Sequence, residues 1–366
     1  MNRINSLVFI FLVISVGCIY GYDELFEYKL ILIKSFKQAK DWCYLGRDQS
    51  FKLHYESPES FIKMPTCMKV DRENKRILII DNNRHQVKVF SKKGDFIKSV
   101  GQPGQGPGDM NSPYWLEFCR DKICICSNGR IDFFDKNLNF KSRLRVFLPF
   151  PRFFVFKDYI YAGISAPYRE KYPLFVKMDI NGRVQDFVID DDMNDHFFRK
   201  IKDDIFILFA NERVIVVPMH WNKIYIYDNQ LKLIRKRSIN YPLLDKVEEW
   251  NLIKDMNRKK NSRIYWPCRM TASAKLFEDK VYILLNLPRL EILVLDHDGK
   301  IKIHFYNDND FQLMKWKDFD IQEEKGKIIF YILGYSLEDE KTEMSDYNVY
   351  RMIDGETNKA SDSNMK

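Results

Sequence analysis

The sequence is poor in alanine and in long apolar runs. Alanine is the strongest helix former, so its scarcity in a chain of 366 residues argues against a mainly helical protein. Beyond the N-terminal segment, no stretch approaches the roughly 18 consecutive apolar residues that a transmembrane helix needs. These two absences favour a β-rich protein that contacts a membrane only through its N-terminus.

Short motifs of familiar catalytic and metal sites are also missing. The six histidines show neither HxH nor HExxH spacing, and the chain has no G-x-S-x-G elbow and no P-loop. The densest acidic run, 190–195, lacks the glycine and final glutamate of an EF-hand and is typical of a solvated loop. We expect no metal and no cofactor, with calcium or zinc held by residues from several repeats as the alternative.

The composition is that of a large folded protein. Apolar residues make up 45% and aromatic residues 15% of the chain, which excludes global disorder. Aromatic and β-branched residues fit the pleated surface of a sheet, so an all-β fold is predicted. The net charge is +8, but acidic and basic residues are interspersed, so we expect no nucleic-acid partner.

The N-terminus has the pattern of an export signal. Arg3 precedes an apolar run, residues 7–16, that is short for a bilayer span and typical of a signal peptide, which we place at 1–21. In one alternative, the stretch ending at Cys18 is a bacterial lipobox and Cys18 carries the lipid. In others, signal peptidase cuts after Gly17 or Gly21, or the segment stays as an anchor. The expected location is the periplasm, outer membrane or cell surface.

Cysteine usage leaves several states open. The cysteines are Cys18, Cys43, Cys67, Cys119, Cys124, Cys126 and Cys268. Removal of Cys18 leaves an even number, which in an exported protein permits disulfides. Cys124 and Cys126 share a face of a predicted strand, but no second pair follows at zinc spacing. Buried thiols, one or two disulfides, and a metal site remain as alternatives.

A repeat of about 45 residues runs along the chain and predicts a β-propeller. Each unit holds two short apolar strands and a polar turn, and the turns recur near 93–94, 136–137, 181–182, 229–230 and 298–299. Each turn has a Gly or Asn available for positive φ. Strands at 327–332 and 348–353 complete a sixth unit. The stretch 51–55 is expected to add the outer strand that closes the ring and hides the sheet edges. We predict an all-β, six-bladed propeller as a single domain over 22–354.

The stretch 100–118 holds four glycines and three prolines, yet it joins two repeats of one type, so we interpret it as a link between blades. Together with 81–90, D-N-N-R-H-Q-V-K-V-F, it resembles the signature of NHL-repeat six-bladed propellers, best over residues 65–140. The resemblance implies a ring around a central channel and a structural role for His85. It implies no single activity.

Two segments depart from the repeat. Between blades four and five, apolar residues within 243–258 recur at steps of three and four, which predicts an inserted amphipathic helix. Two placements are open for this helix: over the channel mouth as a cap, or packed against the side of the propeller. The tail 355–366 is polar, and we expect it to be disordered.

Candidate site residues follow from their place in the repeat. Asp71, Asp121, Asp158 and Asp279 recur at turns, which favours turn capping. Residues after the recurring prolines open the innermost strands and should lie near one channel mouth, where aromatic rings and arginines could hold an anionic or sugar-like ligand. These candidates are Tyr114, Trp115, Arg152 and Arg269, with His220 as a further channel candidate.

The sequence leaves two functions open. The first is an exported or lipid-anchored binding module for protein, peptide or glycan at the bacterial envelope. The alternative is a metal-assisted lyase or hydrolase with its site in the channel, for which no catalytic residue can be named. Packing of the inner strands is the structural explanation for the same mouth residues.

Overall fold

A computed structural model describes most of the repeat region. The described residues are 43–146, 152–164, 173–189, 205–249, 269–287, 289–307, 314–336 and 347–354. The predicted signal segment with Cys18, the acidic run 190–195 and the tail 355–366 lie outside them. One compact unit comprises Asp41–Asn240 and Arg269–Lys366, and a second comprises Met1–Lys40 and Tyr241–Cys268.

The first unit is built from four-stranded antiparallel sheets, each in chain order from its first strand to its fourth. Blade one holds β2 (Pro65–Asp71), β3 (Arg76–Asp81), β4 (Gln86–Ser91) and β5 (Phe96–Val100). Blade two holds β6 (Trp115–Cys119), β7 (Lys122–Ser127), β8 (Arg130–Asp135) and β9 (Phe140–Arg145). Blade three holds β10 (Phe153–Phe156), β11 (Tyr159–Gly163), β12 (Phe175–Asp179) and β13 (Val184–Val188). Blade four holds β14 (Ile205–Ala210), β15 (Arg213–Pro218), β16 (Lys223–Tyr227) and β17 (Leu233–Ser238).

The last two blades share one eight-stranded sheet. Blade five holds β18 (Thr271–Phe277), β19 (Lys280–Leu285), β20 (Leu290–Leu295) and β21 (Ile301–Asn307). Blade six holds β22 (Met314–Glu324), β23 (Lys327–Ser336), β24 (Asn348–Asp354) and the N-terminal β1 (Cys43–Arg47). Strand β1 pairs antiparallel with β24 and parallel with β21, and so joins the two blades.

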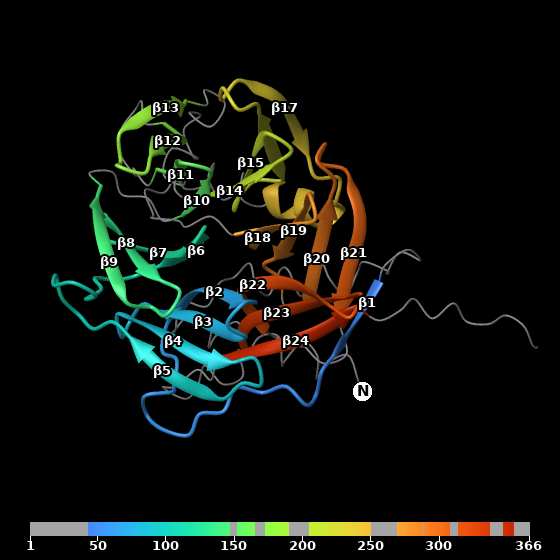
Figure 1. Cartoon of the computed structure of the whole chain (residues 1–366). Coiled ribbons are helices and arrows are strands. Elements are labelled where there is room, and N and C mark those ends of the chain that lie inside the picture. The colour runs from blue at the N-terminus through green and yellow to red at the C-terminus, as the bar shows by residue number, and fades with distance from the viewer. Residues whose placement is uncertain are drawn as a thin grey trace, which may run out of the picture. The chain divides into compact units, whose positions relative to one another are not determined.

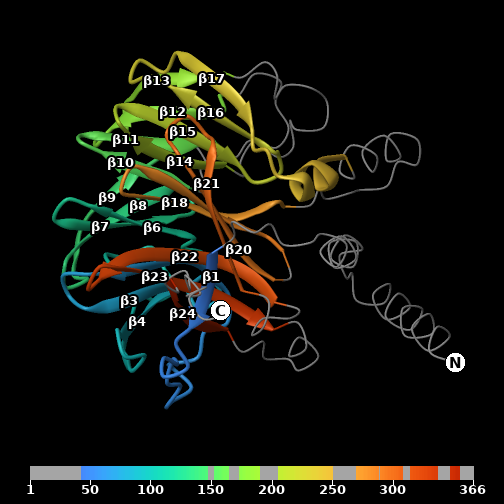
Figure 2. The same ribbon diagram turned by 90° about the vertical axis from the view of Figure 1, so that its right-hand side faces the viewer.

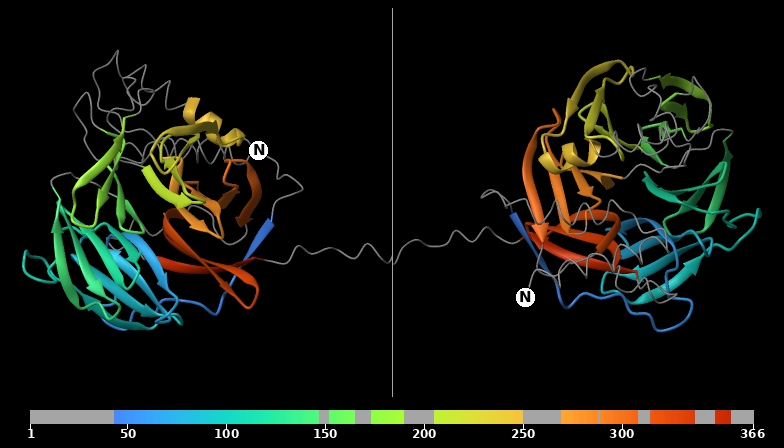
Figure 3. Two further views of the ribbon diagram at one scale, coloured as in Figure 1. Left: turned by 45° about the horizontal axis from the view of Figure 1, so that its top comes forward. Right: turned by 180° about the vertical axis from the view of Figure 1, so that it is seen from behind.

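The first strand of each blade forms a closed ring. Strand β2 contacts β6 and β22, and the contacts then run from β6 to β10, β14, β18 and back to β22. Figure 1 shows the blades arranged around the centre of the ring, Figure 2 shows them from the side, and the right-hand view of Figure 3 shows them from behind. The predicted all-β propeller is confirmed, with six four-stranded blades in the described part of the chain.

The closing strand is not the one that the sequence predicted. Residues 43–47 complete blade six, because a turn in which the Phe51 N–H bonds to the Asp48 carbonyl ends the pairing before 51–55. The segment 51–55 instead passes the β4–β5 turn, where His54 bridges Asp95. A Cβ added at Gly94, whose φ is +96°, would lie 1.9 Å from the Lys52 carbonyl oxygen, so this crossing requires glycine.

The outer hairpins share one turn chemistry. Four of them begin with an aspartate whose Oδ1 accepts the backbone N–H groups two and four residues later; these are Asp135, Asp179, Asp228 and Asp296. Ser91 takes that place in blade one. The fourth turn residue has positive φ, which confirms the prediction at Gly94, Gly182 and Gly299. In the other two hairpins it is Leu138 or Leu231, not a neighbouring Asn or Gln. The aspartate bonds hold these leucines in a conformation that is unfavourable for them.

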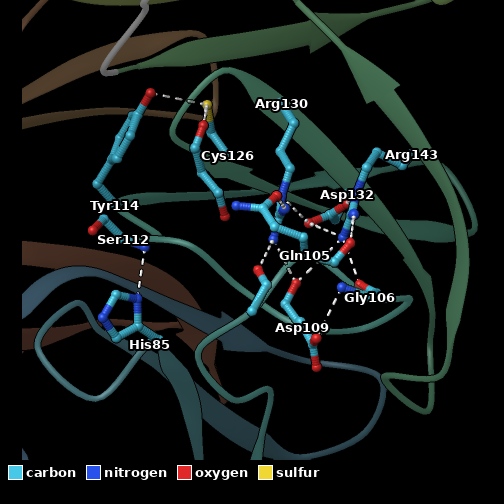
Figure 4. A network of polar contacts seen from close by, with 12 residues as sticks. His85, Gln105, Gly106, Asp109, Ser112, Tyr114, Cys126, Arg130, Asp132 and Arg143 are labelled. Atoms are coloured by element: carbon cyan, nitrogen blue, oxygen red, sulfur yellow. Dashed lines mark hydrogen bonds and ion pairs between the residues drawn. The ribbon is translucent and has the colours of Figure 1, made fainter.

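The glycine-rich stretch is a fixed link and not a hinge. Arg130 Nη2 donates to the Asp109 carbonyl at 2.7 Å, and Arg143 Nη2 donates to the Gly106 carbonyl at 3.0 Å (Figure 4). Asp132, which is fully buried, forms ion pairs with both arginines. The carboxylate thereby neutralises two cations that would be costly to bury alone.

Three further hydrogen bonds complete the link between blades one and two. The Asp109 carboxylate accepts the Gly106 N–H and the Gln102 amide, each at 2.8 Å, and these bonds lower the pKa of Asp109. The Ser112 N–H donates to Nδ1 of His85 at 2.8 Å (Figure 4). His85 therefore has the structural place that the family resemblance implied.

The predicted insertion is described only in part. In the second unit, residues 242–249 are helical, starting at Pro242, whose fixed φ suits a first helical turn. The remainder of the predicted helix 243–258 lies outside the described residues. Whether the insertion caps the channel stays a prediction.

Candidate functional site

Aromatic and cationic side chains fill the propeller axis where the inner strands begin. Trp115 is 6% exposed, and its Nε1 donates to the Phe153 carbonyl at 2.8 Å. The Arg152 guanidinium carbon lies 5.6 Å from the Trp115 ring centroid and 4.6 Å from that of Phe206. Lys275 adds a second cation 4.9 Å from the Trp115 ring. These distances are those of cation–π contacts, which hold β6, β10, β14 and β18 together.

The structure brings two of the predicted mouth residues together and separates the rest. Trp115 and Arg152 meet as described. Tyr114 turns to Cys126, with its hydroxyl 3.4 Å from Sγ (Figure 4), and burial raises the pKa of Tyr114. Arg269 is exposed, and its carbonyl accepts the Asn286 amide at 3.1 Å. His220 is 4% exposed in the loop between β15 and β16.

Two buried ion pairs lie further along the inner strands. Lys275 of β18 is 2.9 Å from Asp318 of β22, whose carboxylate also accepts the Met68 N–H at 2.8 Å. Lys69 of β2 donates to both oxygens of Glu117 of β6, at 2.7 and 3.0 Å. Each pair joins two neighbouring blades through groups that are at most 9% exposed.

Burial and charge act in opposite directions on this layer. Burial alone would lower the pKa of Lys69, but the charges of Glu117 and Asp320 raise it above its usual value. Lys69 therefore stays protonated over the physiological range. Burial raises the pKa of the neighbouring Cys67 thiol to about 12, so this cysteine is an unreactive thiol.

A cavity of about 370 Å³ opens where the inner strands of blades one and two end. Its lining residues are Lys69, Val70, Asp71, Arg72, Glu73, Asn74, Phe118, Arg120, Lys122, Ile123, Lys136, Asp320 and Ile321. They come from the end of β2 and the β2–β3 turn, the β6–β7 hairpin, the β8–β9 turn and β22. Five of these residues are cations and three are carboxylates, so the wall carries an excess of positive charge.

Part of the cavity charge is neutralised within the wall. Asp71 is paired with Arg76 at 2.8 Å, and its Oδ1 accepts the Asn74 N–H, which confirms its predicted turn-capping role. Glu73 pairs with Lys136. Arg72 donates a hydrogen bond to the Ile321 carbonyl at 2.7 Å. Among the described residues, no carboxylate forms an ion pair with Arg72.

A disulfide flanks the cavity. Cys119, at the end of β6, is bonded to Cys124 of β7 and closes the hairpin that carries Arg120 and Lys122. Among the described cysteines, Cys43, Cys67 and Cys126 are thiols. Of the alternatives that the sequence left open, the described residues contain one disulfide together with the buried thiols Cys67 and Cys126, and Cys18 and Cys268 lie outside them.

The described residues were also compared with the requirements of a metal site and of a membrane-spanning helix. Within the described ranges, no three His, Cys, Asp or Glu side chains come close enough to bind a metal together. In the same ranges, no helix has both the length and the apolar character to cross a membrane.

The sequence missed the cavity residues for a physical reason. Lys69, Phe118 and Asp320 lie on three inner strands, and only the closed ring brings them together. A signal was nevertheless present: Lys69 and Lys275 are single cations within apolar inner strands. A buried lysine requires an acidic partner, so each predicts a carboxylate on a neighbouring blade.

The propeller has relatives of known structure. Residues 60–131 match a protein family, DUF5128, described as a 6-bladed beta-propeller. No curated protein matches the sequence. A Bacteroides fragilis protein, named as a presumptive exported protein, is 15% identical with a TM-score of 0.55, over 85% of this chain and 95% of its own.

Two further structures extend the comparison. A DUF4221 family member from Bacteroides vulgatus is 9% identical with a TM-score of 0.55, over 86% of this chain and 99% of its own. The calcium-binding protein regucalcin from Agrobacterium tumefaciens is 7% identical with a TM-score of 0.50, over 87% and 98%. These likenesses show the fold alone, and they confirm the predicted resemblance to NHL-like six-bladed propellers.

Proposed function

We propose that the protein is an exported binding module of the cell envelope. Its propeller binds a glycan, peptide or protein segment, and the ligand enters the cavity where the inner strands of blades one and two end. The observation that carries this proposal is the cavity of about 370 Å³ lined by charged side chains, a volume within the usual range of small-molecule sites.

The packed start of the inner strands supports the same assignment. Trp115 and Phe206 are 6% and 2% exposed, and their rings contact cations of neighbouring blades. Side chains so deeply buried stabilise the ring and leave little surface for a ligand. We therefore assign Trp115 and Arg152 to packing of the channel, and ligand binding to the other end of the inner strands.

Two features support export. The N-terminal sequence has the charge and apolar run of a signal peptide, with Cys18 as a lipidation candidate. The Cys119–Cys124 disulfide is a bond that forms and persists in oxidising compartments such as the periplasm. Lipid attachment at Cys18 would add a membrane anchor to the same binding role.

The test is a binding screen with the protein recovered after export. Arrays of glycans and peptides should yield at least one ligand, and Arg72→Gln/Lys122→Gln should weaken its binding strongly. Binding that is unchanged in this double variant would place the ligand elsewhere on the propeller. Turnover of a ligand that stops on chelation and resumes with added calcium or zinc would favour the metal-assisted lyase or hydrolase instead.

A further inference from the structure

From the chemistry of the cavity wall we infer that the ligand carries an acidic sugar, a hexuronate unit whose carboxylate lies between Arg72 and Lys122. This inference rests on the proposed binding function and gives its ligand a chemical class. Two sets of groups carry it: cations that are held in place, and acceptors that suit sugar hydroxyl groups.

Arg72 is positioned before any ligand binds. Its Nη2 donates to the Ile321 carbonyl at 2.7 Å, and its guanidinium carbon lies 5.3 Å from the Phe277 ring centroid. That hydrogen bond uses one of five N–H donors, so the fork keeps others for a carboxylate. A guanidinium held in this way loses little side-chain entropy when it binds an anion.

Lys122 and Arg120 add positive charge from the other side of the cavity. Lys122 begins β7, and its Nζ lies 5.8 Å from the Phe133 ring centroid. Arg120 precedes it in the hairpin turn with a φ of +56° and pairs with the exposed Asp158 at 3.0 Å. The disulfide between Cys119 and Cys124 holds this hairpin closed.

The acidic residues of the wall select against a bare polyanion. Asp320 accepts the Val70 N–H at 2.7 Å and the Ile321 N–H at 3.0 Å, and an ionised carboxylate has further lone pairs for hydroxyl donors. Glu73 is an exposed second acceptor. A phosphate would meet both charges, whereas a uronate offers one carboxylate to the cations and several hydroxyl groups to the acids. Phe118, which is half-buried in the wall, offers a ring to the apolar face of a sugar.

The test is calorimetric titration of the exported protein at low salt. The probes are a glucuronate-containing disaccharide, the same disaccharide with glucose in place of glucuronate, and inorganic phosphate. We expect only the first to bind well. Arg72→Gln/Lys122→Gln should weaken its binding roughly a hundredfold, since each lost charged contact changes affinity about tenfold or more. Arg72→Lys should keep part of the affinity.

A matched control separates local contacts from net charge. Lys232→Gln/Lys300→Gln removes two exposed cations from outer turns of blades four and five, and should leave binding unchanged. Equal weakening in both double variants would contradict the inference, as would equal binding of the neutral disaccharide or of phosphate. If arrays give a peptide ligand but no acidic sugar, the inference fails while the binding function stands. If arrays give nothing at all, both fail.

Discussion

The inner strands differ sharply between their two ends. Where they begin, Trp115, Arg152 and Phe206 fill the axis with rings and a cation in contact. Where β2 and β6 finish, charged side chains line a cavity instead. The same backbone repeat therefore forms a packed end and an open end of the inner strands. The side chains at the inward-facing positions determine whether an end is packed or open.

The buried ion pairs lie between the packed end and the cavity end of the inner strands. The Lys69–Glu117 pair joins β2 to β6, and its Lys69 also lines the cavity. Substitutions towards the packed end should change stability and spare binding. Substitutions of the exposed residues on the cavity wall should change binding and spare stability.

The largest effect is expected at the packed end. Trp115→Ala removes a buried indole that contacts Phe206, Arg152 and Lys275, and should lower the free energy of unfolding by about 3–5 kcal/mol. Chemical denaturation measures this loss. Binding of the acidic disaccharide should persist under native conditions. Its disappearance in a folded Trp115→Ala protein would contradict the division between the ends.

An effect of similar size is expected from the buried pair. Glu117→Leu leaves the Lys69 ammonium buried beside fewer negative charges, which should cost about 3–5 kcal/mol of stability. Lys69→Met/Glu117→Leu removes both charges and should recover much of this loss. Denaturation curves for wild type, single and double variants test the point. A double variant no more stable than Glu117→Leu would show that the pair contributes more than mutual neutralisation.

The disulfide should have a smaller effect. Cys119→Ser/Cys124→Ser opens a loop with a sequence separation of five, and loop entropy gives a loss of about 2 kcal/mol. Since the hairpin carries Arg120 and Lys122, the variant should also bind the disaccharide less tightly. Thermal unfolding with and without reductant checks the stability change. The serine variant should show no further response to reductant.

Two buried lysines provide a contrast in pH dependence. Burial lowers the pKa of Lys88 to about 8, whereas carboxylates raise that of Lys69. A folded pKa below the unfolded value means that the unfolded chain binds more protons between about pH 8 and pH 10.5. The Lys88 contribution to stability therefore rises with pH across that window. Lys88→Met should remove this rise in pH-resolved denaturation. An unchanged pH profile would contradict it.

The smallest effect on stability is expected at the cavity wall. Arg72 is exposed and forms one described hydrogen bond to a backbone carbonyl, so Arg72→Gln should change the free energy of unfolding by no more than about 0.5 kcal/mol. Thermal unfolding measures this, beside the loss of binding. A large destabilisation would assign Arg72 to the structure and not to a site.

Local patterns predicted most of the fold. A repeat of about 45 residues with short apolar strands and polar turns predicted the blades, and Gly94, Gly182 and Gly299 have the predicted positive φ. The aspartates that hold Leu138 and Leu231 in the same conformation were visible in the sequence, but their role depends on bonds to later N–H groups. The closing strand was predicted at 51–55, whereas residues 43–47 form it in the structure. The difference depends on the turn at Asp48, which local sequence patterns do not predict.

The candidate site was less predictable than the fold. Proline spacing located the beginnings of the inner strands and brought Trp115 and Arg152 together correctly. It could not show that these groups are buried, because burial depends on rings from blades far away in sequence. The cavity residues lie at strand ends, in turns and on β22, and their proximity follows from ring closure between β22 and β2.

The most direct test is a crystal structure of the exported protein with the glucuronate-containing disaccharide. Our account predicts the sugar carboxylate beside Arg72 and Lys122, with hydroxyl groups at Asp320 or Glu73 and with Trp115 and Arg152 unchanged. A sugar bound at Tyr114, Trp115, Arg152 or Arg269, with the cavity empty, would contradict the account and return the site to the beginning of the inner strands.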